Sequence, residues 1–255
     1  MLKKCYKAEV LKNRHTAAGK LTVGMPLAVV FIAAVLTEDY VVIDCYNWWY
    51  MGLLPAFTAL LSGVMYEKEK RQRNRNILSL PIDMKKIWDG KVLYGIRMLF
   101  ISLFVLCGAV LLAGFLFKEL LHIELAVEIG IENQLVAAAV LFFTSLWQVP
   151  FCLLLLQLFG GAAAPLIHVV GYMCMAVVIS LKPYFMLLPG AISARLMCSI
   201  LKVLPNGLVA RPESVTYLPE LVTYKGGLAG IISSILWFLL LWKVGRQVFE
   251  RQVAE

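Results

Sequence analysis

The amino-acid sequence has few charged residues and lacks several common enzyme motifs. Asp, Glu, Lys and Arg make up 16% of its 255 residues, against about a quarter in ordinary soluble domains. It has no GxxxxGK[ST] loop, which excludes nucleotide hydrolysis by this chain alone, and no HExxH or GxSxG motif. We therefore expect a non-catalytic protein without catalytic residues, a bound cofactor or a metal site. A basic surface with base-reading elements is also missing, which argues against nucleic acid as a partner.

The sequence has no pair of cysteines spaced as in a metal site or a redox motif. The six cysteines form no CxxC pair, and four of them fall in or beside apolar runs or in the basic N-terminal arm. Only Cys45 and Cys198 are placed where they could meet outside a membrane, and the sequence does not show whether they pair. We interpret the six cysteines as small hydrophobic residues.

Hydrophobic residues, in contrast, make up 61% of the chain. They gather in runs long enough for a bilayer core about 30 Å thick, which needs roughly 20 apolar residues per helix. The runs are Leu21–Thr37, Trp48–Tyr66, Val92–Phe117, Gln134–Phe159, Leu166–Leu188 and Gly226–Trp242. The predicted fold class is an all-α integral membrane protein with six transmembrane helices. The small residues of Gly160–Pro165 predict a tight link between the fourth and fifth spans.

Basic residues sit at alternate ends of these runs. Of the 24 Lys and Arg, 18 fall in Leu2–Lys20, Glu67–Arg97 and the tail after Trp242. The polar segments between them carry mainly acidic residues instead, namely Glu38, Asp39 and Asp44, and Glu119, Glu124, Glu128 and Glu132. The positive-inside rule then places both termini in the cytoplasm and gives one membrane domain, with a bundle at 21–242 and a tail at 243–255. Anionic membrane lipids are the expected partners of the net charge of +8.

Residues 1–20 are expected to form a helix at the membrane interface. At 100° per residue, Leu2, Cys5, Tyr6 and Val10 share a stripe, with Lys3, Lys4, Lys7 and Arg14 opposite. An apolar face against lipid and a basic face against head groups are typical of interfacial helices. The alternative is a solvated basic tail.

Two features are assigned to the outer side of the membrane. Trp48, Trp49 and Tyr50 fall where an outer aromatic belt is expected, so we interpret them as membrane anchors. The apolar stretch Ala191–Leu204 is too short to span and ends at Pro205-Asn206-Gly207, which predicts a turn. This pattern indicates a re-entrant or interfacial hairpin.

Polar residues inside the spans are the candidates for a substrate path. Gln148 and Gln157 in the fourth span and His168 in the fifth are the main ones. For His168 the alternatives are a simple interhelical hydrogen bond and a place near the cytoplasmic mouth.

Three outer glutamates, Glu124, Glu128 and Glu132, are spaced four apart and would repel one another on a single helix. They could attract a cation or a cationic substrate. The alternative is that the loop simply lacks Lys and Arg and is not one regular helix.

The loop between the second and third spans carries its own structural signals. Pro81 ends a short turn at Asn76–Leu80, and Asp83 is a good N-cap for the helix that follows. We therefore expect a helix, a short transverse helix and a second helix. Ile77, Leu78 and Leu80 are apolar residues in a loop that otherwise faces water, so we expect another surface to cover them.

This loop resembles the corresponding loop of ABC-2 type permeases. The resemblance lies in Glu69, Arg73, Asn76-Ile77-Leu78-Ser79-Leu80-Pro81-Ile82-Asp83 and Gly90-Lys91. With Asn47-Trp48-Trp49-Tyr50 and Leu204-Pro205-Asn206-Gly207, the chain is most similar to the permease subunits of lantibiotic-immunity ABC transporters, over its whole length and span order. One departure is Asn76, where many ABC-2 permeases carry glycine-threonine, and it suits the immunity branch.

The resemblance implies a coupling helix that docks on a cytoplasmic ABC ATPase, which binds ATP and Mg²⁺. The positions implied for that contact are Arg75, Asn76, Ile77, Leu78, Leu80 and Pro81. It also implies a second permease subunit, identical or paralogous, in a bacterial cytoplasmic membrane. The implied function is export of a lantibiotic or similar cationic peptide for self-protection. Export of a drug, ion or polysaccharide, or a stand-alone membrane immunity protein, are the alternatives.

Overall fold

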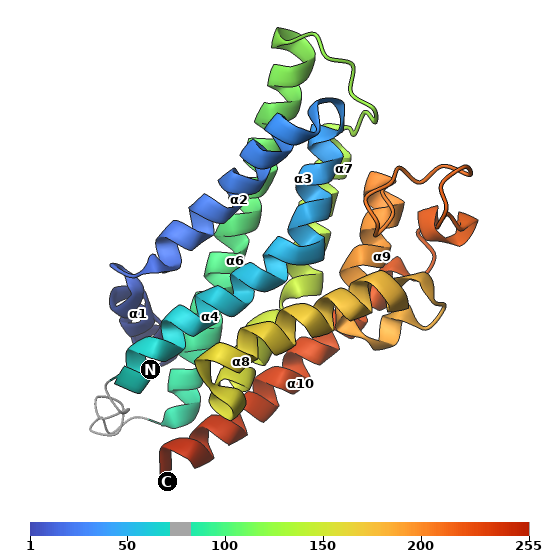
Figure 1. Cartoon of the computed structure of the whole chain (residues 1–255). Helices are drawn as coiled ribbons and strands as arrows, with labels where there is room; N and C mark the ends of the chain where they lie inside the picture. The colour runs from blue at the N-terminus through green and yellow to red at the C-terminus, as the bar shows by residue number, and fades with distance from the viewer. Residues whose placement is uncertain (72–82, 255) are drawn as a thin grey trace.

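The computed structural model describes residues 1–71 and 83–254, and these residues form helices joined by loops, with one isolated β-bridge between Val203 and Val209 (Figure 1). Five helical segments are long and apolar enough to cross a membrane. They are Ala17–Leu36, Glu38–Glu67, Met84–Leu120, Ile131–Leu181 and Gly227–Arg251. The described chain therefore has the architecture of an all-helical, multi-pass membrane protein.

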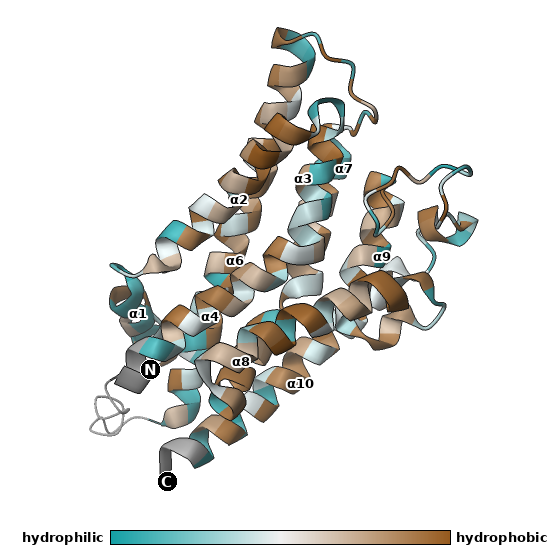
Figure 2. Ribbon diagram, in the orientation of Figure 1, coloured by the Kyte–Doolittle hydropathy of each residue, from teal (hydrophilic) through white to brown (hydrophobic). Residues whose placement is uncertain are grey.

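The helices lie side by side along much of their length (Figure 1). Their bounds are α1 (Leu2–Asn13), α2 (Ala17–Leu36), α3 (Val41–Trp48), η2 (Trp49–Leu53), α4 (Leu54–Arg71), α6 (Met84–Phe115), η3 (Leu116–Leu120), α7 (Ile131–Ser145), α8 (Gln148–Val178), α9 (Pro189–Leu201) and α10 (Gly227–Ala254). In Figure 2, α1 is mostly hydrophilic, whereas α2, α6 and α8 are hydrophobic over most of their length. Both chain ends and the start of α6 lie at the same end of the bundle (Figure 1).

Capping residues set where two long helices begin. Thr16 caps α2, with its hydroxyl oxygen accepting a hydrogen bond from the Ala18 backbone N–H at 3.3 Å. Asp83 caps α6 in the same way, accepting from the Lys85 N–H at 3.0 Å. The predicted N-cap at Asp83 is therefore confirmed, and α6 starts at Met84.

Two of the three expected outer anchors are buried inside the bundle, and Trp48 is partly buried. Trp49 and Tyr50 are 0% exposed, and so lie inside the bundle at the start of the π-helical turn Trp49–Leu53. Nearly all of the preceding helix α3 is buried as well. The Trp49 ring lies 6.0 Å from that of Phe57 on α4. The interpretation of these two residues as membrane anchors was wrong, because other helices enclose this segment of the chain.

The chain reverses direction within α8. Gly160 has φ 80° and ψ −178°, a conformation that glycine adopts easily and other residues rarely do. In one straight helix, Gln148 and His168 would be about 30 Å apart, because each residue adds 1.5 Å. Their side chains are instead 3.1 Å apart. Residues 148–159 (the first arm) and 161–178 (the second arm) therefore form a hairpin, which confirms the predicted tight link.

The N-terminal helix is present and packs against α6. Cys5 is buried, Tyr6 and Val10 are partly buried, and a Cβ at Gly90 would come within 3.0 Å of the Cys5 backbone carbon. Gly90 thus allows α1 to lie directly on α6. Most of the apolar stripe contacts protein, and a location of α1 at the membrane interface stays a prediction.

The short apolar stretch after α8 forms the helix α9, and every residue of α9 is buried. It is too short to span, as expected, and ends at Lys202 in the left-handed conformation (φ 57°). All six cysteines are free, and Cys45 and Cys198 are both buried and unpaired. Burial raises the pKa of the Cys198 thiol to about 12. The interpretation of the cysteines as small hydrophobic residues is confirmed for the five that are buried.

Candidate functional sites

A cluster of buried polar side chains joins α4 to both arms of α8. Thr58 comes from α4, Gln148 and Cys152 from the first arm, and His168 from the second arm. All four side chains are buried, although they lie in segments long and apolar enough to cross a membrane. We call these four residues the buried polar cluster.

Hydrogen bonds connect the cluster across the three helices. The Thr58 hydroxyl lies 3.0 Å from Gln148 Oε1 and 3.0 Å from the Pro55 carbonyl oxygen. His168 Nε2 lies 3.1 Å from Gln148 Oε1 and 3.4 Å from Thr58 Oγ1. Cys152 Sγ approaches the same hydroxyl at 3.9 Å. The imidazole of His168 therefore makes an interhelical contact, one of the two alternatives considered for it.

The donors and acceptors allow two arrangements of this cluster. If Gln148 Oε1 faces the imidazole, His168 carries its proton on Nε2, and the single Thr58 hydroxyl proton must serve Gln148 or Pro55. If the amide is rotated, its NH₂ group donates to both Thr58 and His168, and Thr58 is free to donate to Pro55. Either arrangement leaves one end of the Gln148 amide and His168 Nδ1 without a partner among the described residues. The cluster therefore keeps unused hydrogen-bonding capacity.

Aromatic rings surround the imidazole. The ring centroids of Trp147, Phe151 and Tyr172 lie 5.7, 5.6 and 6.3 Å from that of His168. Trp147 and Tyr172 also stack on one another, with their centroids 6.4 Å apart. No ion pair within the described residues includes His168. Its imidazole is therefore a buried polar side chain enclosed by aromatic rings, with uncharged hydrogen-bond partners.

The third candidate for the substrate path, Gln157, lies away from this cluster. It is nine residues beyond Gln148 on the first arm, or about 14 Å along the helix axis. The structure thus brings Gln148 and His168 together and leaves Gln157 apart. The described residues contain no group of three or more His, Cys, Asp or Glu side chains that could hold a metal ion.

A second group of polar contacts ties the start of α6 to α10. Asp89 Oδ1 accepts a hydrogen bond from Trp242 Nε1 at 2.8 Å and pairs with Arg246 Nε at 3.2 Å. The Trp88 Nε1–H donates to the Trp242 carbonyl oxygen at 3.2 Å. A Cβ at position 245 would overlap the buried Trp88 ring. Because Gly245 has no Cβ, α10 can lie directly against that ring.

The start of α6 is also tied to α1. The buried carboxylate of Glu9 pairs with Lys12 at 2.7 Å and with Lys91 at 3.5 Å. Lys91 Nζ lies 5.8 Å from the centre of the Phe249 ring on α10, which completes a connection of three helices. We call these contacts of α6 with α1 and α10 the α6 clamp. It lies at the end of the bundle that carries both chain termini (Figure 1).

The residues predicted to contact an ATPase lie outside the described residues. These are Arg75, Asn76, Ile77, Leu78, Leu80 and Pro81. The described chain stops at Arg71 on one side and resumes at Asp83 on the other. The α6 clamp begins within a few residues of that second point.

Several residues of these sites are not among the sequence candidates. Asp89 and Glu9 had a usable signal, because each is an isolated acidic residue in a basic segment, where a buried partner is the natural explanation. No sequence signal marked Thr58, Trp242 or Arg246, because their roles depend on contacts with helices distant in sequence.

A scan against protein-family models gives no match for this chain, and a search of curated proteins finds no similar sequence.

Proposed function

We propose that this chain is the membrane-spanning permease subunit of an ABC exporter. A separate cytoplasmic ATPase would bind ATP and Mg²⁺ and hydrolyse ATP. Within the sequence, the basis is the loop at residues 67–91, whose pattern resembles the coupling loop of ABC-2 type permeases. The architecture of long apolar helices is compatible with this assignment.

The proposed topology has six spans with both termini in the cytoplasm. The hairpin at Gly160 supports it, because the segment Ile131–Leu181 can then cross twice. Residues 161–181 give about 32 Å of helix, close to the thickness of a bilayer core. An even number of crossings agrees with both chain ends lying at the same end of the bundle (Figure 1).

The observation that carries the proposal is the α6 clamp. A coupling segment that moves one membrane helix also moves the helices that are firmly attached to it, as one rigid body. Asp89, Glu9 and Lys91 attach α6 to α1 and α10 within the first two turns after Asp83. Movement of the preceding loop would therefore shift three helices together.

The proposed substrate is a lantibiotic or similar cationic, amphiphilic peptide that is expelled to protect the cell. This assignment comes from the resemblance to the immunity branch of the permeases. Inside the bundle, Gln148 and His168 each have a polar atom that lacks a partner among the described residues, at the junction of three helices. We assign them to the substrate path or to a contact that changes between its two states, and Gln157 to the same path.

The proposal is tested in the host by measuring peptide sensitivity. Leu78→Asp and Leu80→Asp should abolish protection while leaving the amount of membrane-inserted chain unchanged, because each puts a charge on the predicted apolar contact. Ser79→Asp is the matched control, since it adds the same charge to the same loop without removing an apolar residue. Full protection by both leucine variants would contradict the assignment of this loop as the contact with the ATPase.

A further inference from the structure

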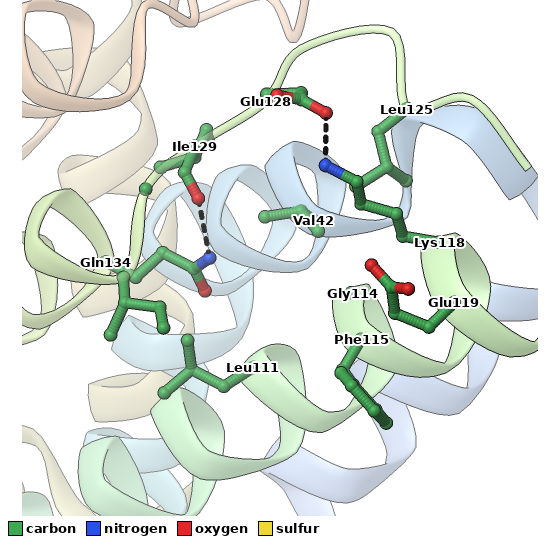
Figure 3. Close-up of a pocket in the computed structure, with 12 residues that line it drawn as sticks. Val42, Leu111, Gly114, Phe115, Lys118, Glu119, Leu125, Glu128, Ile129 and Gln134 are labelled. Carbon is green, nitrogen blue, oxygen red and sulfur yellow. Dashed lines mark hydrogen bonds and ion pairs between the residues drawn. The ribbon is translucent and has the colours of Figure 1, made fainter.

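A pocket lies at the end of α6 remote from the chain termini, between α6, α3 and the start of α7 (Figures 1 and 3). Its volume is about 410 Å³, within the usual range of small-ligand pockets. The walls are mainly apolar, formed by Val42, Leu111, Phe115 and Leu125. Such walls suit an aliphatic stem.

Gln134, Glu119 and Glu128 bring hydrogen-bond acceptors to the pocket, and the one lysine among the lining residues, Lys118, donates to Glu128. Gln134 is 5% exposed, and its Nε2–H donates to the Ile129 carbonyl oxygen at 3.0 Å. That bond fixes the amide orientation, and it leaves Oε1 without a partner within the described residues. Figure 3 shows this oxygen on the side of the amide away from Ile129. A buried, unpaired acceptor is unfavourable, which indicates that a donor belongs there.

The charges at the pocket favour a cation. Lys118, Glu119 and Glu128 are its three charged residues, and Lys118 is paired with Glu128 at 2.6 Å. This hydrogen bond lowers the pKa of Glu128 below its usual value, so both members of the pair stay charged at neutral pH. No ion pair within the described residues includes Glu119. In Figure 3, Glu119 and Gln134 lie on opposite sides of the pocket with Val42 between them.

We propose that this pocket binds a primary ammonium group carried on an aliphatic stem. The ammonium donates to Glu119, the stem fits against Val42 and Leu111, and an N–H group at the far end of the stem donates to Gln134 Oε1 across the pocket. A bare divalent cation does not fit, because it needs about six oxygen ligands and the walls are mostly apolar. An anionic ligand is disfavoured by the net negative charge of the lining residues.

Two sources carry this chemistry, namely the lysine side chain of a peptide and the ethanolamine head group of a lipid. The first source rests on the proposed function, since a cationic peptide is the proposed substrate. The pocket itself is tested without any ATPase or protection assay, so its failure and the failure of the proposed function are distinguishable.

The test uses the purified full-length chain in nanodiscs of phosphatidylcholine. Binding of Nα-acetyl-lysine methylamide is followed by saturation-transfer NMR, with the Nε-acetylated compound as the uncharged control probe and glycerophosphoethanolamine, which has no net charge, as the lipid probe. We expect the lysine probe to bind and its acetylated form not to bind. Binding of glycerophosphoethanolamine as well would support the ammonium pocket and show that the lipid head group is a possible source.

Variants locate the site. Glu119→Gln should weaken binding of the lysine probe about tenfold, because it removes one charge-assisted hydrogen bond. Glu124→Gln is the matched control, since Glu124 is an exposed carboxylate of the neighbouring loop and does not line the pocket. Gln134→Leu should also weaken binding, although it removes the bond to Ile129. Equal binding by the Glu119→Gln and Glu124→Gln proteins, or equal binding of the two lysine probes, would overturn the proposal.

Discussion

Replacing Gly245 by alanine is the sharpest perturbation of the α6 clamp. An added Cβ would lie 2.8 Å from Trp88 Cη2 and 2.9 Å from Cε2, and nearer still to Cζ2. Atoms in contact are normally about 3.5–4.0 Å apart. Trp88 is 0% exposed, so its rigid ring has no free space into which to turn. α10 must therefore move away from α6 by about 1 Å.

The expected cost follows from that movement. Overpacking of a closely packed interior costs about 1–3 kcal/mol. The shift also weakens the bond from Trp88 to the Trp242 carbonyl oxygen, which contributes about 1 kcal/mol. Alanine recovers up to about 1 kcal/mol through its higher helix propensity than glycine. The net destabilisation is about 1–3 kcal/mol, or a drop in unfolding temperature of about 3–10 °C.

The buried cysteines provide the assay. Five of the six thiols are buried, so they react with a fluorogenic maleimide only when the protein unfolds. All proteins in the assay carry Cys174→Ser, because the exposed Cys174 thiol would react in the folded state. Gly108→Ala is the matched control, because it lies in α6 with nothing within 4 Å of the added Cβ. Combining Trp88→Phe with Gly245→Ala should restore part of the stability that Gly245→Ala loses, because phenylalanine lacks the ring atoms that the added Cβ would overlap. An unfolding temperature for Gly245→Ala equal to that of Gly108→Ala would refute the close packing of α10 on Trp88.

Three further predictions concern other parts of the chain. Gln148→Leu should destabilise the protein by about 0.6–2 kcal/mol in the same thiol assay, and less than additively when combined with His168→Phe, because each loses the same interhelical bond. Arg195→Met should increase protease cleavage in the loop after α9, because the guanidinium donates to the Glu220 carbonyl oxygen at 2.9 Å and so holds that loop; unchanged cleavage would contradict this role. Acidification should open the Lys118–Glu128 pair only as pH falls through the lowered pKa of Glu128, since the pair is present above that value; carboxyl NMR of Glu128 that titrates at an ordinary glutamate pKa would contradict the contact.

The helical class and the tight link at Gly160 followed from the sequence, because apolar run length and small residues are local signals. Asp83 as a helix cap was predictable for the same reason. The burial of Trp49 and Tyr50 could not be predicted, because it depends on helices distant in sequence that enclose this segment.

The candidate sites were predictable only in part. His168 and Gln148 stood out as polar residues in apolar runs, and the structure brings them together. Their partner Thr58 did not stand out, because threonine is common in membrane helices and its role depends on contact with residues about ninety positions away. The pairing of Asp89 with Trp242 and Arg246 joins residues even more distant in sequence, so no local pattern could predict it.

The central claim is that this chain works with a separate ATPase, and co-purification tests it most directly. The chain is tagged in its own host, extracted gently from the membrane, and its partners are identified by mass spectrometry. We predict recovery of an ABC ATPase in a fixed ratio to the chain, reduced by Leu78→Asp and unchanged by Ser79→Asp. Recovery of the chain alone, under conditions that keep a known ABC exporter of the same membrane intact, would contradict the claim.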